Sequence, residues 1–197
     1  MQHLSRYYRD SLCLDRTEEG RKFLSAMRDV LTLPAFRALA EYRHHRSVDR
    51  RQHALSVAYL SYRVCLSRGL LAEEAARAAL LHDLFFYDRA HPGAPAFLYY
   101  RHPRIALENA RRCLTLTPTE EDAILHHMWP MLPVPPRTTE GRVVSRMDKY
   151  CAVREFFARR RAGAKRPPCH DDLHERKFIT RDRTTETYPQ FFDHRPH

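Results

Sequence analysis

The chain has 197 residues, of which 43% are hydrophobic and only five are glycine. This length fits one compact domain with a modest extension, and the wealth of alanine, leucine and arginine favours helix over sheet. No stretch approaches the roughly 18 apolar residues of a membrane-spanning helix. The formal net charge of +10 would attract phosphorylated substrates, nucleic acid or anionic membranes, although a basic tail and solvated arginines explain it equally.

The first part of the chain indicates short helices. We expect residues 1–16 to be poorly ordered or lightly docked. Apolar residues then recur with helical spacing over 17–31, and Pro34 begins a short helix that reaches Ala40. The basic segment 43–47 is predicted to be a loop.

Two longer helices are predicted next. Asp49 is a suitable N-cap for a helix that reaches about Ser67, and Gly69 stands just past its end, where glycine is favoured. Residues 72–86, AEEAARAALLHDLFF, form an alanine-rich helix that permits close packing. The segment 87–100 contains two prolines and a glycine, and is predicted to be a loop or lid.

Three more helices and a tail complete the predicted order. One helix is expected from His102-Pro103 to about Thr115, and a capping-box pattern introduces another over 121–128. The four prolines of 129–137 exclude regular structure there. A last core helix covers 140–160, with inward positions Val143, Val144, Met147, Cys151, Phe156 and Phe157. Residues 161–197 lack periodicity and are predicted to be largely disordered.

Histidines and aspartates recur at inward positions of these helices. His53 lies on the stripe of Val57 and Leu60, so it should point into the core. His82 shares the alanine face of its helix, and Asp83 follows it. An ionised aspartate among alanine and leucine requires a counter-charge, which a cation bound by both residues would supply.

Three further candidates come later in the chain. His102 and His127 each share a helical face with apolar residues, and Asp148 faces inward with Val144. A lone core histidine is most often only hydrogen-bonded, and a salt bridge to arginine would equally explain Asp148. A shared metal ion explains the coincidence of five such helices better. Mixed imidazole and carboxylate ligands favour Fe, Mn, Co, Ni or Zn over Ca or Mg.

The order of these residues resembles the HD superfamily of metal-dependent phosphohydrolases over roughly residues 40–157. His53 stands in QHALSVAYLSYRV, His82-Asp83 in AALLHDLFFYD, and Asp148 in SRMDKYCA. The resemblance implies that these four residues bind one metal ion, with His82 and Asp83 as catalytic residues.

Some members of the superfamily carry two more histidines and hold two ions. His102 in YRHPRIALENA and His127 in ILHHMWP stand in the matching order. The segments RHPRIALENARR and HHMWP also resemble a group of bacterial HD proteins, and this likeness implies no particular substrate.

We therefore expect an all-α fold, an HD-domain helical bundle with a central metal site. Residues 1–40 would be a helical lead-in, 41–160 the metal-binding helical core and 161–197 a basic tail. Four residues are candidates for contacts with substrate: Lys149, His126, His45 and Arg101. A solvated surface residue explains Lys149 and His45 at least as well, and His126 could instead support the metal ligands.

The main functional hypothesis is hydrolysis of a small phosphate ester or nucleotide by a metal-activated water, with one or two divalent transition-metal ions as cofactor. One alternative is a non-catalytic HD protein that binds a nucleotide in a regulatory role. Another is a basic protein that binds nucleic acid and whose metal is structural, which is not favoured because no nucleic-acid motif accompanies the charge. No membrane partner is expected.

Five cysteines, with no CxxC pair and no regular spacing, indicate a reducing compartment. The N-terminal residues also lack the apolar core of a signal peptide. Both observations predict a cytoplasmic protein.

Overall fold

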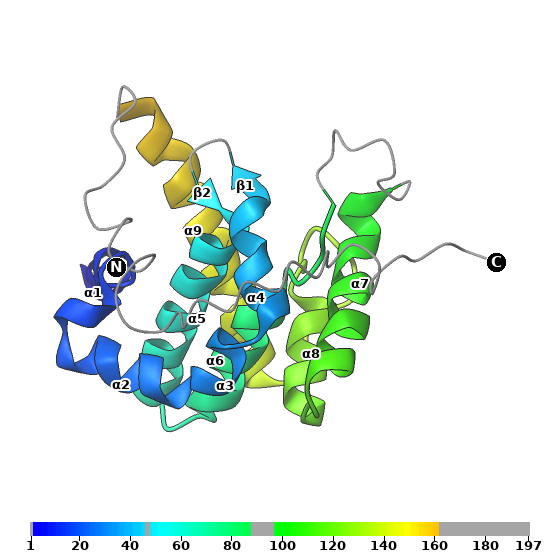
Figure 1. Cartoon of the computed structure of the whole chain (residues 1–197), viewed down its shortest axis with the longest axis horizontal. Coiled ribbons are helices and arrows are strands. Elements are labelled where there is room, and N and C mark those ends of the chain that lie inside the picture. The colour runs from blue at the N-terminus through cyan, green and yellow to red at the C-terminus, as the bar shows by residue number, and fades with distance from the viewer. Residues whose placement is uncertain (1, 46–47, 88–96, 162–197) are drawn as a thin grey trace.

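The computed structural model describes residues 2–45, 48–87 and 97–161 and is a helical bundle (Figure 1). Its N-terminal part contains α1 (Gln2–Asp10), the 3₁₀ helix η1 (Leu14–Arg16), α2 (Glu18–Ala26), α3 (Arg28–Leu31), α4 (Pro34–Ala38) and the 3₁₀ helix η2 (Leu39–Glu41). The strands β1 (Arg43–His45) and β2 (Val48–Asp49) precede α5 (Arg50–Leu66), α6 (Ala72–Leu81), α7 (Leu98–Cys113), α8 (Pro118–His126) and α9 (Thr139–Arg161). The predicted all-α class is confirmed.

The centre of the bundle is formed by α5, α6 and α9. Helix α5 is buried around most of its circumference because it packs against α6 and α9 and also receives α1, α2 and α4. Figure 1 shows α1 and α2 on one side of these central helices and α7 and α8 on the other. Helix α8 contacts α6, α7 and α9, so it connects the outer pair to the centre.

Local sequence signals set the ends of several helices as predicted. The Asp49 side chain accepts a hydrogen bond from the Gln52 amide at 2.7 Å and caps α5. Past the other end of α5, Gly69 has a positive φ of 66°, a conformation that glycine adopts without strain. Thr117 and Glu120 form the predicted capping box at the start of α8.

Four predictions about the elements are wrong. Residues 1–16 are not a loose lead-in, because α1 packs on α5 and Leu14 is fully buried. The predicted loop at 43–47 contains β1, which pairs antiparallel with β2 in a small hairpin. Helix α6 ends at Leu81, short of residue 86, and α7 begins at Leu98, four residues before His102.

The inward face of α9 also differs from the prediction. Phe156 and Phe157 are about half exposed, whereas Glu155 is almost completely buried. The buried stripe follows Val144, Asp148, Cys151 and Glu155, at helical spacings of three and four residues. Phe156 and Phe157 lie beyond Glu155, off this stripe.

Other predictions fall partly on segments that are not described. The predicted loop or lid at 87–100 falls mostly on residues 88–96, and the predicted tail falls on 162–197; both lie outside the described residues. Within the described ranges, no helix is both long and apolar enough to cross a bilayer. Cys65, Cys113 and Cys151 are free thiols, as expected for these three cysteines.

Candidate metal centre

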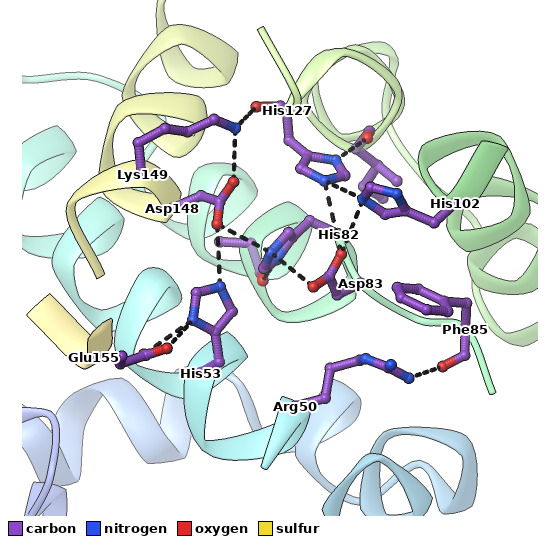
Figure 2. Close-up of polar contacts among 12 residues, drawn as sticks. Arg50, His53, His82, Asp83, Phe85, His102, His127, Asp148, Lys149 and Glu155 are labelled. Atoms are coloured by element: carbon purple, nitrogen blue, oxygen red, sulfur yellow. Dashed lines mark hydrogen bonds and ion pairs between the residues drawn. The ribbon is translucent and has the colours of Figure 1, made fainter. Parts of the chain in front are cut away.

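Six side chains that are distant in sequence converge between the helices (Figure 2). They come from α5, the end of α6, α7, the end of α8 and α9, and all six are buried: His53, His82, Asp83, His102, His127 and Asp148. Figure 2 shows His82 and Asp83 in the middle, with His53 and Asp148 on one side and His102 and His127 on the other. The structure thus brings together every residue that the sequence predicts as a metal ligand.

The first group of ligand atoms comprises His53, His82 and Asp148, whose atoms lie within 4.8 Å of one another. His53 Nε2 is 3.1 Å from Asp148 Oδ1, and His82 Nε2 is 3.9 Å from the same oxygen. These three side chains are close enough to share one ion, and they supply the imidazole and carboxylate mixture that transition metals accept.

The second group comprises His82, Asp83 and His127, again within 4.8 Å of one another. His102 adjoins it, because its Nε2 lies 3.4 Å from Asp83 Oδ1 and 3.0 Å from His127 Nε2. His82 belongs to both groups. The cluster therefore has the donors for one ion or for two neighbouring ions.

Backbone carbonyls select which nitrogen of three imidazole rings faces the cluster. In each case Nδ1 donates to the carbonyl three residues earlier: His82 to Ala79 at 2.7 Å, His102 to Tyr99 at 2.9 Å and His127 to Ile124 at 2.8 Å. His82 and His127 are the C-cap residues of α6 and α8, and the carbonyls of a last helical turn lack an intrahelical partner. With Nδ1 protonated, each neutral ring directs the lone pair of Nε2 inward.

The surroundings of these lone pairs show whether the site suits a cation. His82 Nε2 is buried and has no hydrogen-bond partner. The Nε2 atoms of His102 and His127 face each other at 3.0 Å, although both rings already donate through Nδ1. An unpaired buried acceptor costs about 1–3 kcal/mol, and two opposed lone pairs repel. A metal ion bound by these nitrogens removes both penalties, so the donor set fits a divalent transition metal.

Burial favours the uncharged form of His102 and His127. It lowers the pKa of His127 well below its usual value, and the neighbouring rings of His82 and His102 add to the effect. Burial likewise lowers the pKa of His102. Both shifts favour the neutral ring, which is the form that binds metals.

His53 is held differently, by a residue that sequence reasoning missed. Both carboxylate oxygens of Glu155 lie 3.0 Å from His53 Nδ1. Burial alone would lower the pKa of His53, but the charge of Glu155 and the hydrogen bond with Asp148 outweigh it and raise the pKa to about 10. Glu155 stands seven residues after Asp148, two turns along the same helix face, and this spacing is the signal that could have found it.

Asp148 carries its negative charge in a buried setting. Burial would raise the pKa of this carboxyl, but the hydrogen bond with His53 and the Lys149 ammonium lower it well below the usual range. Lys149 Nζ donates to Asp148 Oδ2 at 2.7 Å and also to the carbonyl of His127. Lys149 thereby connects α9 to the end of α8 at the edge of the cluster.

The segment after Asp83 is fixed by a buried arginine. The Arg50 guanidinium donates to the carbonyls of Phe85 and Tyr87, and lies 3.8 Å from the centre of the Phe85 ring. The Phe85 ring in turn packs against His102. These contacts hold the non-helical residues 84–87 against the start of α5.

The four predicted substrate contacts are placed differently from one another. Lys149 lies at the cluster, whereas Arg101 is exposed at the start of α7. His126 Nδ1 pairs with Asp122 at 2.9 Å, and among the contacts of the described residues none joins it to the six ligand candidates. His45 lies in β1, and its side chain is outside the described residues.

Buried imidazoles and carboxylates at the ends of packed helices define a helical protein with a candidate metal centre. The HD domain family model matches residues 50–153, more than half of the chain, and the chain belongs to the HD domain family. HD domains bind divalent metals, and members of the family are commonly hydrolases. Searches of the curated proteins and of the solved structures found no match.

Proposed function

We propose that this protein is a metal-dependent phosphohydrolase that cleaves a phosphomonoester or phosphodiester, with nucleotides among its substrate class. The observation that supports this most is the set of inward lone pairs on His82, His102 and His127 beside the carboxylates of Asp83 and Asp148. A site with only a structural metal would need four ligands, whereas this cluster offers six candidate donor residues.

The residues of the chain would divide the work as follows. His53, His82 and Asp148 hold one ion, and Asp83, His102 and His127 complete a second position. Bound divalent ions of the Fe, Mn, Co, Ni or Zn type acidify water and draw charge from a phosphoryl oxygen. Asp83, which lies between the two groups, is positioned to orient the attacking water and accept its proton.

Lys149 is the substrate contact that the geometry favours. Its side chain is about one quarter exposed and its ammonium lies beside Asp148, so it can meet an anionic group that approaches the cluster. The net charge of +10 would also raise the local concentration of phosphorylated substrates. Arg101, His126 and His45 remain secondary proposals.

The test compares wild-type protein with the Asp83→Asn variant. We expect wild type to contain a divalent transition metal by elemental analysis and to release phosphate or an alcohol from a panel of phosphomonoesters and phosphodiesters. Asp83→Asn keeps the size of the side chain but loses its charge, so hydrolysis should fall to background. Equal turnover by the two proteins would refute the enzyme assignment. Metal binding without turnover on any substrate would favour a regulatory HD protein.

A further inference from the structure

We propose that Glu155 positions the metal ligand His53, so that the metal centre extends two residues past the segment that the HD domain family model matches. This proposal rests on the proposed metal site. Glu155 would not touch the ion or the substrate, because it acts through the imidazole ring.

The contacts of Glu155 support a positioning role. Both of its oxygens lie 3.0 Å from the Nδ1 atom of His53, on the side of the ring opposite the Nε2 atom that faces Asp148. Figure 2 shows the ring between the two carboxylates of α9. A carboxylate that accepts the Nδ1 proton fixes the tautomer and orientation of the ring, and makes Nε2 a stronger donor to a metal.

His53 needs such a partner more than the other ligand histidines do. His82, His102 and His127 each donate Nδ1 to a backbone carbonyl, which their own helix supplies. His53 lies in the first turn of a 17-residue helix, where its Nδ1 instead pairs with a side chain 102 residues later in the chain. The packing of α5 against α9 brings the two side chains together.

Burial of the His53–Glu155 pair costs free energy that a purely structural contact would not require. Glu155 is 1% exposed and His53 is fully buried. A buried carboxylate requires strong partners to remain ionised, and an apolar residue would fill the same space without this penalty. The negative charge is useful beside a ring that donates electron density to a cation.

The experiment measures Co²⁺ binding and does not depend on enzymatic activity. Metal-free wild type, Glu155→Gln and Glu155→Asp are titrated with Co²⁺ against a competing chelator, and the visible absorption of the bound ion is recorded. We expect Glu155→Gln to bind Co²⁺ about 10- to 100-fold more weakly, with an altered spectrum because the His53 ligand is less well held.

Glu140→Gln is the matched control. Glu140 is also a buried glutamate of α9, but it lies near the opposite end of the helix, where its Oε1 accepts a hydrogen bond from the Leu71 amide at 3.1 Å. Because this hydrogen bond is weakened, Glu140→Gln should have a lower free energy of unfolding in the metal-free state. Its Co²⁺ affinity and absorption spectrum should remain those of wild type.

The order of the two Glu155 variants separates positioning from space filling. Glu155→Asp keeps the charge and loses a methylene, so it should retain more affinity than Glu155→Gln, which keeps the size. The reverse order, or wild-type affinity in Glu155→Gln, would refute the role of Glu155 alone. Wild-type protein that takes up no Co²⁺ would instead refute the metal site itself, and the proposal with it.

Discussion

Asp83 presents a different oxygen to each of the two ligand groups. Its Oδ2 lies 3.7 Å from His82 Nε2, whereas Oδ1 lies 3.4 Å from His102 Nε2 and 3.7 Å from His127 Nε2. A carboxylate in this position would offer a donor oxygen to either group. Because His102 and His127 contact only the Oδ1 side, their loss should empty one position and leave the other.

At the residue scale, we therefore predict the metal stoichiometry of His102→Ala. Wild type should hold close to two equivalents after dialysis, and His102→Ala close to one, because His53, His82 and Asp148 remain. Elemental analysis of both proteins measures this. His126→Ala is the control, since His126 pairs with Asp122 beyond the cluster, and it should match wild type. The same metal content in His102→Ala and wild type would rule out the two-ion arrangement.

At the scale of elements, α7 contains a proline where an ordinary helix would not. Pro103 is the sixth residue of α7, and it has no N–H to donate to the carbonyl of Tyr99, four residues earlier. His102 Nδ1 donates to this carbonyl instead. The lost backbone hydrogen bond thus becomes the contact that orients a ligand.

This account predicts opposite effects for Pro103→Ala. The new N–H would compete for the Tyr99 carbonyl, so α7 should become as stable or more stable, while affinity for the ion near His102 falls about 10-fold. Chemical unfolding and metal titration measure the two effects. Pro118→Ala is the control, because Pro118 is the first residue of α8, where an N–H has no helical acceptor. A fall in stability with unchanged affinity would contradict the account.

At the scale of the whole molecule, one hydrophobic core joins the N-terminal segment to the metal-binding helices. Leu14, Phe23 and Phe36 belong to the same buried cluster as Tyr59 and Leu80. We therefore propose that residues 1–40 complete the core of the body at 41–160, although they precede the segment that the family model matches.

Leu14→Ala should then lower the free energy of unfolding of the entire domain by about 2–5 kcal/mol, the usual cost of a cavity at a fully buried leucine. Urea unfolding of the metal-free protein should remain a single transition with a lower midpoint. Leu66→Ala is the control, because Leu66 is 57% exposed and its loss should be nearly neutral. A second, separate transition in Leu14→Ala would show instead that the N-terminal segment unfolds independently.

The sequence could predict the features that depend on local chemistry. The Asp49 cap, the Thr117 capping box and the inward position of each candidate ligand side chain follow from residue type and helical spacing, and the structure agrees with them. The HD family was also predicted, from the order of His53, His82-Asp83 and Asp148.

Features that depend on packing could not be predicted in this way. Helical spacing continues through His82, so the end of α6 at Leu81 is decided by side-chain contacts: His82 takes a backbone carbonyl, and Arg50 holds the following segment. The spacing of Glu155 places it on the inward face of α9, but its partner could not be predicted from the sequence. Its burial becomes understandable only when α9 lies against α5 and His53 faces it.

The separation of the ligands along the chain has a consequence for folding. His53 and Asp148 are 95 residues apart, and the loop between them contains α6, α7 and α8. An ion held by both would act as a reversible cross-link that shrinks the entropy of the unfolded chain, as a disulfide across a long loop does. Removal of the ion should therefore lower the free energy of unfolding, because the ion binds the folded chain and not the unfolded one.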